Sequence, residues 1–432
     1  MTSTELQTLD QTLTYHFTMY YGERRYGFAA QHDNEWYIVH PRDYTKNNDI
    51  AAVGFKVLPE QIMDCRPSDG NTNSNANHNS FSYDGSTSFK TLVVFGAGAS
   101  HDYCYQKDLD GKPPLTCNLF CDKYSNLIEK FPGVENLSSQ IQQAGDIETY
   151  FQRQWDKVFK QHNQQLLNKL IDVQYYLHYL FLGISSQPNY ARNNYVAFLQ
   201  FLYDHLIGKG PKEKAMIVTF NYDTLLEKSL ERSHNYSFDS MDDYIDLSRR
   251  FIVFKPHGSC NWIRNIDVEF CKTLHPKGEP SMENLHRDIY RNQVSLGRLM
   301  QHLAEDITLL PPHNLWSNYY FPQLLIPYKT KDSFVMPETH TIAMETFLGQ
   351  VDSIFIIGWK GAEEKFKKLL GEKLGNKKIL VRYVNNKDDT IEKELRPVLP
   401  HAIFTEVAPF EDSIPTFTGL NKVMHEITEI FD

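Results

Sequence analysis

The stretch Thr91-Leu-Val-Val-Phe-Gly-Ala-Gly-Ala-Ser100 decides the fold of this chain. Its first five residues have the character of a buried strand, and an uninterrupted apolar strand is typical of a parallel sheet covered on both faces. Gly96 and Gly98 allow a tight turn and the close approach of a ligand to the backbone. A helix that starts after them would direct its free N–H groups at a phosphate. The pattern favours a phosphate-binding turn; because His101 replaces the third glycine of the usual dinucleotide motif, a turn without a ligand is the alternative.

The chain after this turn alternates between strand and helix patterns. Six apolar stretches are predicted to be strands: residues 215–220, 251–255, 323–327, 353–358, 378–384 and 401–407. Helical periodicity separates several of them, including residues 363–374, and predicts a final helix over 420–431. A longer helical block predicts a helical insertion over about 120–208 that could cover the site. The alternation predicts an α/β fold with a doubly wound, Rossmann-like parallel sheet.

The chain before the turn has a different composition. Residues 1–65 are predicted to be a small β-rich accessory unit, because residues 13–62 are rich in aromatic and β-branched residues separated by turn residues. Residues 66–90 alternate Asn with small polar residues, cannot bury apolar surface, and are predicted to be a flexible linker. The main domain is then expected over residues 91–432.

Composition excludes several classes of function. The formal net charge of -10 argues against a general nucleic-acid-binding face. The six cysteines contain no CxxC pair, which argues against a zinc ribbon and against a thioredoxin-type redox site. We find no secretory signal, and the most apolar stretch, around residues 175–184, is too short to span a membrane. We therefore expect a soluble, cytoplasmic protein that does not bind nucleic acid directly.

Polar or small residues follow four of the predicted strands, and we expect them to lie at one edge of the sheet. They are Asn221 and Asp223, His257 and Gly258, Gly358, and Asn385. One such residue means little, because Asn and Asp after a strand are commonly turn formers and a single His is commonly structural. Several of them after a glycine turn predict a ligand site, because ligands of such sheets bind at the carboxyl ends of the strands.

Three of these elements resemble the signature of the sirtuin family, in the family's order. They are the glycine turn of residues 96–100, Phe220-Asn-Tyr-Asp223, and His257-Gly258. The overall layout, with a large helical insertion, resembles the SIR2-like domains of prokaryotic anti-phage defence systems. The resemblance covers roughly residues 90–410, so the main domain of 91–432 is predicted to be a SIR2-like, NAD-binding catalytic domain.

The resemblance implies three catalytic residues. Asn221 would lie by the nicotinamide ribose and help to place the attacking water. Asp223 would face the nicotinamide carboxamide, and His257 would be the base at the ribose hydroxyls. These residue types suit the reaction, because histidine titrates near neutral pH and an uncharged amide orients water without adding charge.

The resemblance also implies the residues that bind the rest of NAD+. The pyrophosphate and the nearby ribose would be held by Gly96, Ala97, Gly98 and Ser100, with Gly258 beside the base. Gly358 and Asn385 would contact the phosphate and the adenosine ribose. The pair Trp359-Lys360 departs from the small residues that the family has at this place.

One departure from the family bears on the type of reaction. Sirtuin deacylases have a four-cysteine zinc module soon after the histidine, whereas only Cys260 and Cys271 follow here. We therefore expect no zinc, and we expect water to accept the ADP-ribosyl group of NAD+, which is a substrate. The predicted activity is NAD+ glycohydrolase. The alternatives are an ADP-ribosyltransferase or deacylase, and a sensor that binds NAD+ or ADP-ribose without turnover.

The cellular role follows from the resemblance alone. We expect depletion of NAD+ during abortive infection, and such an activity has to be restrained in an uninfected cell. Restraint by a homo-oligomer or by a separately encoded partner is expected, and a HerA-type ATPase or a short Argonaute are the candidates that the resemblance offers.

Overall fold

The computed structural model describes two separate units of the chain, Met1–His78 and Asn79–Asp432. The described residues are 16–20, 23–32, 35–39, 55–57, 62–64, 87–103, 112–186, 193–274, 282–311, 319–328, 334–384 and 390–407. Most of the predicted linker, the predicted final helix over 420–431 and the predicted site residue Asn385 lie outside these ranges. No helix of the described residues has both the length and the apolar content needed to cross a membrane.

The first unit contains a five-stranded antiparallel sheet in the order β4-β3-β2-β1-β5. Its strands are β1 (His16–Tyr20), β2 (Glu23–His32), β3 (Glu35–Val39), β4 (Phe55–Val57) and β5 (Ile62–Asp64). The hairpin of β1 and β2 pairs Tyr20 with Glu23, so only two residues connect these strands. The β-rich character predicted for residues 13–62 is confirmed.

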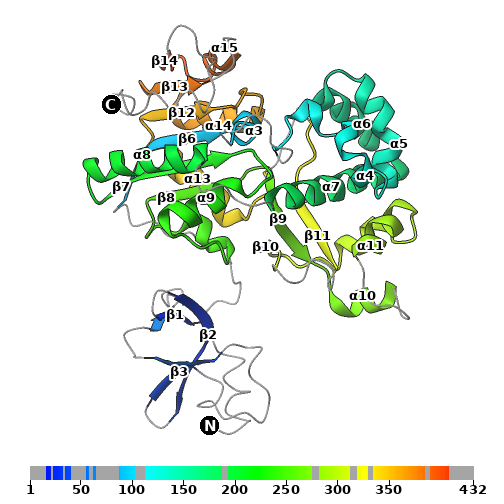
Figure 1. Ribbon diagram of the computed structural model, residues 1–432, viewed down its shortest axis with the longest axis horizontal. Coiled ribbons are helices and arrows are strands. Elements are labelled where there is room, and N and C mark those ends of the chain that lie inside the picture. Colours follow the sequence, from blue (N-terminus) through cyan, green and yellow to red (C-terminus); the bar gives the residue numbers. More distant parts are fainter. Residues whose placement is uncertain are drawn as a thin grey trace. The chain divides into compact units, whose positions relative to one another are not determined.

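The second unit is built on a six-stranded parallel sheet in the order β14-β13-β12-β6-β7-β8 (Figure 1). Its strands are β6 (Ser88–Phe95), β7 (Glu213–Thr219), β8 (Phe251–Phe254), β12 (Ser353–Ile357), β13 (Leu380–Val384) and β14 (Ile403–Glu406). Phe95 pairs with both Thr219 and Ile357, so the carboxyl ends of the three central strands are level. This is the predicted doubly wound sheet, and the prediction of the fold class is confirmed.

Apolar strands and helices form the core around this sheet. Residues 92–95 of β6 are completely buried, as expected for a central parallel strand covered on both faces. The helices of this layer are α3 (Ala97–His101), α8 (Asn194–Lys209), α9 (Leu225–His234), α13 (Glu338–Leu348), α14 (Glu364–Leu374) and α15 (Thr390–Leu395), with the 3-10 helix η4 (Met241–Ile245). The strand predictions for this sheet are displaced at their ends by at most three residues, the usual uncertainty of element ends.

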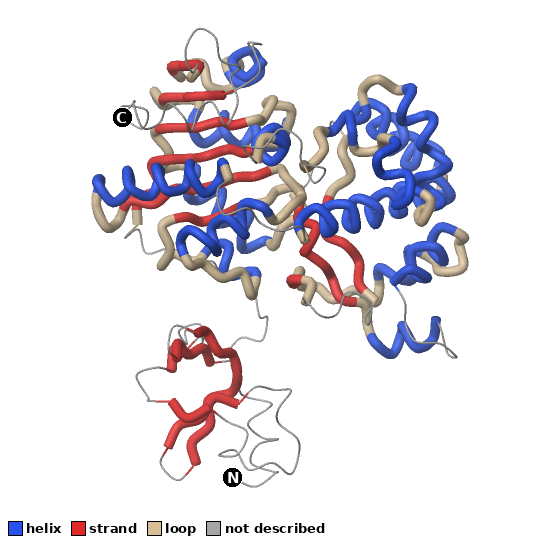
Figure 2. The backbone as a smooth tube through the Cα atoms, in the orientation of Figure 1, coloured by secondary structure: helices blue, strands red, loops and turns tan. Residues whose placement is uncertain are grey.

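A second hydrophobic core forms a lobe beside the sheet, and it comes from two separate stretches of the chain. The first stretch supplies η2 (Thr116–Asn118), η3 (Asp122–Tyr124), α4 (Ser125–Ile128), α5 (Pro132–Gln143), α6 (Ile147–Gln161) and α7 (Gln164–Ser185). The second supplies β9 (Gly258–Asn265), α10 (Val268–Leu274), α11 (Met282–Tyr290), α12 (Leu296–Met300), β10 (Thr308–Leu309) and β11 (Tyr320–Leu324). Figure 2 shows the three strands of this lobe between its helices and the parallel sheet.

Two predictions about this lobe need correction. The strand predicted over 323–327 is β11, and it pairs antiparallel with β9 instead of joining the parallel sheet. Sequence alone missed β9, because its mixed residues Gly-Ser-Cys-Asn-Trp-Ile-Arg-Asn show neither an apolar run nor a regular alternation. Helix α8 falls inside the predicted insertion of 120–208, but its apolar side chains belong to the core of the sheet. Helical periodicity predicts a buried face without indicating which layer covers it.

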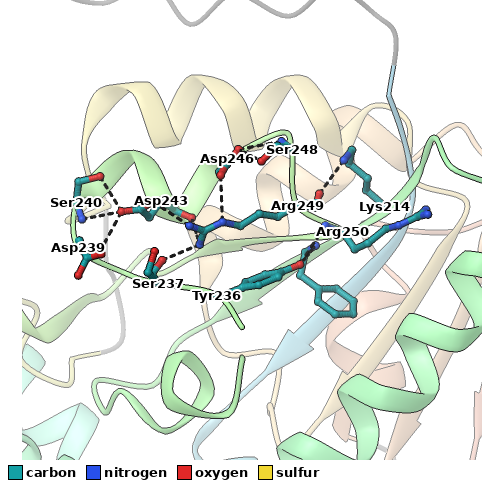
Figure 3. Close-up of polar contacts among 11 residues, drawn as sticks. Lys214, Tyr236, Ser237, Asp239, Ser240, Asp243, Asp246, Ser248, Arg249 and Arg250 are labelled. Atoms are coloured by element: carbon teal, nitrogen blue, oxygen red, sulfur yellow. Dashed lines mark hydrogen bonds and ion pairs between the residues drawn. The ribbon is translucent and has the colours of Figure 1, made fainter. Parts of the chain in front are cut away.

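The amino ends of β7 and β8 are joined by a dense polar network (Figure 3). The Arg249 guanidinium donates to Asp243 Oδ1 at 2.9 Å, to Asp246 Oδ2 at 3.1 Å and to the Ser237 carbonyl at 2.8 Å. The ring of Tyr236 lies 4.9 Å from the Arg249 Cζ atom. We call this network the amino-end brace and define it as Lys214, Tyr236, Asp243, Asp246, Arg249 and Arg250.

Candidate functional site

The predicted site residues lie at the carboxyl ends of the parallel strands, at the opposite end from the amino-end brace. Counted in chain order, the parallel sheet has the order 3-2-1-4-5-6, with β6 and β12 as the central pair. In this topology the order of the strands reverses between the central pair, and ligands bind at the carboxyl ends of the strands there. Gly96 directly follows β6 and Gly358 directly follows β12, so the two turns flank this switch point.

The two glycine turns are packed against each other. A Cβ atom on Gly96 would lie 2.4 Å from the Gly358 carbonyl oxygen. Gly358 has a φ of +65°, and its own Cβ would lie 2.4 Å from the Ala99 nitrogen. The N–H groups of Gly96 and Gly98 donate to the carbonyls of Ile357 and Gly358, at 3.0 and 3.1 Å. Glycine is therefore required here for contact between the turns, a reason that the sequence analysis did not anticipate.

The side chain of Asn221 lies just after β7 and reaches the glycine turn. Its Nδ2 atom donates to the Gly96 carbonyl at 3.0 Å and to Ser100 Oγ at 2.9 Å, and lies 3.3 Å from the Tyr195 hydroxyl. A carbonyl oxygen only accepts hydrogen bonds, so the contact with Gly96 fixes which end of the carboxamide carries the nitrogen. The Asn221 amide oxygen makes no hydrogen bond within the described residues, although Asn221 is only 7% exposed. This oxygen can accept a hydrogen bond from a ligand.

Asp223 is buried at the start of α9, where it is 3% exposed. Its Oδ1 atom accepts a hydrogen bond from the Leu225 N–H at 3.1 Å, which holds the carboxyl group at the first turn of the helix. Burial raises the pKa of Asp223 above its ordinary value, and the positive charge of Lys255 partly opposes this effect. A carboxyl group with a raised pKa in a buried place is typical of functional sites.

A buried ion pair between Lys255 and Glu227 contacts the backbone of Asp223. It was not predicted from the sequence. The Lys255 ammonium contacts Glu227 Oε1 at 2.7 Å and donates to the Asp223 carbonyl oxygen at 2.6 Å. The side chains of Lys255 and Glu227 are 0% and 3% exposed. Tyr244 adds a hydrogen bond from its hydroxyl to Glu227 at 3.1 Å. A lysine that directly follows an apolar strand was the signal that could have found this pair.

His257 lies at the end of β8 and is 4% exposed. Its ring centroid is 4.8 Å from that of Phe220 and 6.4 Å from that of Tyr222, the two neighbours of Asn221 in the sequence. Gly258 has a φ of +75°, and a Cβ there would lie 2.0 Å from the Gln323 carbonyl oxygen of β11. Close approach to β11 therefore requires the glycine, and it fixes the backbone that carries His257.

Trp359 directly follows Gly358 in the turn after β12. Its ring stacks on Phe220 with a centroid distance of 5.5 Å and an interplanar angle of 18°. Phe366 packs edge-on against Phe220 at 5.3 Å, and the Trp359 indole N–H donates to Glu363. Aromatic surface therefore borders His257 on the side of β12.

The structure brings most of the predicted residues to this edge of the sheet. Gly96, Gly98, Ser100, Asn221 and Gly358 are in direct contact through the bonds and close approaches described above. Asp223 and His257 lie on the neighbouring strand ends, and Ala97 is the first residue of α3. The assignment of any of these residues to a part of NAD+ stays a prediction.

The two cysteines that follow His257 are buried as neutral thiols. Burial raises the pKa of Cys260 to about 12 and that of Cys271 to about 11. The Cys260 thiol lies 3.6 Å from the Ser185 hydroxyl, and Cys271 Sγ contacts the Ile266 carbonyl. Metal ions bind the thiolate form, which these surroundings disfavour. Within the ranges that the structure describes, no three His, Cys, Asp or Glu side chains are grouped as a metal site.

A polar hollow on the lobe formed by the second hydrophobic core contains none of the predicted site residues. It is lined by Gln154, Lys157, Gln161, Asn163, Gln165, Leu166 and Lys169. Long, flexible amide and lysine side chains of this kind are typical of open surface, so we place the candidate site at the strand ends instead.

One segment of the chain matches a known protein family. Residues 215–295 match a family described as the SIR2-like domain, and this segment contains Asn221, Asp223 and His257. The match confirms the predicted resemblance to SIR2-like domains for this segment of the chain. No curated protein matched the sequence.

Two solved structures of low similarity were also found. A structure of Sir2Tm bound to a propionylated peptide is 10% identical, with a TM-score of 0.34, over 78% of this chain and 93% of that chain. A Sir2 homolog–NAD complex is 12% identical, with a TM-score of 0.33, over 78% of this chain and 90% of that chain. Similarity at this level carries no argument about the chemistry.

Proposed function

From the SIR2-like domain, we propose that this chain is an NAD+ glycohydrolase that transfers ADP-ribose from nicotinamide to water. The orientation of Asn221 carries the proposal. Its amide nitrogen is held by Gly96 and Ser100, which leaves its amide oxygen as an acceptor at the end of β7, and the next strand of the sheet, β8, is followed by His257. An oriented acceptor and a base on adjacent strand ends suit the activation of a hydroxyl group or a water molecule.

The proposed reaction makes modest demands on the protein. The bond between the ribose C1′ atom and the nicotinamide nitrogen breaks, and the bonding electrons leave with nicotinamide as a neutral pyridine. Because this leaving group needs no proton, no strong acid is required. The ribose passes through an oxocarbenium-like state, as in other glycoside cleavages. Water attacks C1′ and loses a proton, and the products are ADP-ribose, nicotinamide and one H+.

Each of the three polar residues has a role in this scheme. The Asn221 amide oxygen accepts a hydrogen bond from the ribose or from the attacking water. His257 takes the proton from a ribose hydroxyl or from that water. Asp223 faces the nicotinamide carboxamide, which can donate to a carboxylate and accept from a carboxylic acid. The raised pKa of Asp223 is therefore compatible with binding in both protonation states.

We propose that the chain depletes NAD+ in anti-phage defence and is silent at rest. Asn221, Asp223 and His257 are each at most 7% exposed, so NAD+ reaches them only after neighbouring side chains move. A second copy of the chain or a separately encoded partner would supply the restraint or the trigger. A HerA-type ATPase and a short Argonaute remain the proposed partners.

The experiment that tests the function is NAD+ consumption by the purified full chain, with products separated by chromatography. Asn221→Ala should reduce turnover by about 100- to 1,000-fold, the usual effect of removing an oriented polar group from an active site. Asn168→Ala is the matched control, because Asn168 is a buried asparagine of α7 that accepts a hydrogen bond from Gln164 at 2.9 Å. The control should keep the turnover of the wild type.

The products separate the alternatives. Free ADP-ribose and nicotinamide support the glycohydrolase, whereas a label from NAD+ on protein would indicate an ADP-ribosyltransferase. Tight NAD+ binding without turnover, alone and with the candidate partners, would contradict the glycohydrolase and support a sensor.

A further inference from the structure

Three consecutive residues at the start of α8 join the two halves of the candidate site. They are Asn193, Asn194 and Tyr195, and all three are at most 1% exposed. One half of the site is the glycine turn with α3, and the other is the segment from Asn221 into α9. From the sequence alone, these residues fall within the predicted helical insertion and have no predicted role. Their contacts depend on how α8 packs on the sheet.

The two asparagines fix the position of α8. The Asn194 backbone N–H donates to the Tyr103 carbonyl at 2.9 Å, and its side chain donates to the Asp102 carbonyl, so Asn194 holds the end of α3. Asn193 Oδ1 accepts from the Val196 N–H at 2.9 Å, which caps α8. The same oxygen accepts from the Ser229 hydroxyl of α9 at 3.3 Å. The start of α8 is therefore bonded to both α3 and α9.

Tyr195 extends from this fixed point into the site. Its hydroxyl lies 2.9 Å from Ser100 Oγ and 3.3 Å from Asn221 Nδ2. Its ring packs edge-on against Phe95, the last residue of β6, at 5.0 Å and 82°. Burial raises the pKa of Tyr195 well above its ordinary value, so the hydroxyl keeps its proton at neutral pH and can both donate and accept.

We propose that Tyr195 is a positioning residue that fixes the Asn221 carboxamide for the reaction; the inference rests on the proposed function. The terminal torsion of an asparagine side chain has a broad preference, so the amide plane needs partners to hold it. Gly96 decides which end of the amide carries nitrogen, and Ser100 and Tyr195 restrict rotation of its plane. Tyr195 acts through Asn221 and Ser100.

Tyr176 provides a matched control for a structural role. It is also completely buried, and its hydroxyl donates to the Leu119 carbonyl at 2.6 Å. It belongs to the second hydrophobic core, where its ring packs against those of Phe120 and Phe131. Tyr176→Phe and Tyr195→Phe each remove one buried hydroxyl group and keep the ring.

The experiment compares both variants of the full chain in NAD+ turnover, melting temperature and backbone hydrogen exchange. Tyr195→Phe should lower kcat about tenfold, a smaller loss than the 100-fold or more that removal of a catalytic group gives, and change KM less than about twofold. Exchange in residues 219–225 should become faster. Tyr176→Phe should leave kcat and this exchange unchanged. Ser100→Ala combined with Tyr195→Phe should lose less than the product of the two single losses.

The outcomes separate this inference from the proposed function. If the wild type is active and Tyr195→Phe behaves like Tyr176→Phe in kcat and exchange, Tyr195 is structural and the inference is overturned. If the wild type is inactive both alone and with the candidate partners, but exchange responds only to Tyr195→Phe, the positioning of Asn221 by Tyr195 is supported and the glycohydrolase is contradicted. Equal loss of kcat in both tyrosine variants would also overturn the inference, because a general loss of structure would explain it.

Discussion

The two ends of β7 and β8 both carry polar clusters, but they use them differently. In the amino-end brace, Arg249 donates to two carboxylates and to backbone carbonyls, so its charge is satisfied within the protein (Figure 3). At the carboxyl ends, the Asn221 side chain donates hydrogen bonds through its amide nitrogen, and its amide oxygen has no hydrogen-bond partner among the described residues. A polar group that is paired on every side contributes stability, whereas one that is held from one side keeps a face for a ligand.

The electrostatic balance differs in the same way. The brace pairs Asp243 with Arg249 at 2.9 Å. At the other end, burial raises the pKa of Asp223, which shows that its charged form is held at a cost. The positive charge of Lys255 offsets part of this cost, whereas the negative charge of Glu227 adds to it. Lys255, which has no role in the proposed reaction, therefore stabilises the charged form of Asp223.

Lys255→Met should have the largest effect on stability. It leaves the buried Glu227 carboxylate without its partner, and breaking a buried ion pair costs about 3–5 kcal/mol. Denaturant unfolding measures the loss. Lys272→Met is the control, because the pair of Lys272 with Glu269 is 64% and 78% exposed and should contribute less than about 1 kcal/mol. Equal losses in the two variants would contradict the role given to Lys255.

Arg249→Met should have the next largest effect, and it tests the brace. Asp243 is almost completely buried, whereas Arg249 is 10% exposed, so we expect a loss of about 2–4 kcal/mol. Because the brace lies at the amino ends of the strands, NAD+ turnover per folded molecule should not change. Denaturant unfolding and turnover, measured on the same preparation, check both statements. A tenfold loss of turnover in fully folded protein would show that the amino-end brace affects the chemistry at the carboxyl ends of β7 and β8.

Asp223→Asn should have the smallest effect on stability, and it should be favourable at neutral pH. Because burial raises the pKa of Asp223, its contribution to stability is fully present below the ordinary value of 3.8 and is lost as the pH rises through the folded-state pKa. Asparagine avoids this loss and keeps an oxygen for the Leu225 N–H. The melting temperature of the variant should exceed that of the wild type at pH 7, and the difference should shrink as the pH falls towards 4. A variant that is less stable at pH 7 would contradict this account.

The sequence predicted the parts of the fold that depend on local pattern. Residues 91–95 and the other apolar runs predicted the parallel strands, because such strands are covered on both faces wherever they lie in the sheet. The strand ends then predicted that Asn221, Asp223 and His257 lie at one edge of the sheet. These inferences need only the order of elements along the chain and the rule that parallel strands end at one edge.

The sequence could not predict contacts between elements that are far apart in the chain. The pairing of β9 with β11 and the packing of α8 on the sheet depend on tertiary structure. For the same reason, the sequence assigned no role to Tyr195, and the contact between Gly96 and Gly358 was missed. Asn385 lies outside the described residues, so its predicted role stays open to experiment.

The most direct test of the central claim is NAD+ turnover per folded molecule in Asn221→Ala and Arg249→Met, measured side by side with the wild type. The account predicts a loss of about 100-fold or more for Asn221→Ala and a rate near that of the wild type for Arg249→Met. If Asn221→Ala keeps its turnover, or if both variants lose it equally, the carboxyl ends of β7 and β8 are not the site of NAD+ hydrolysis.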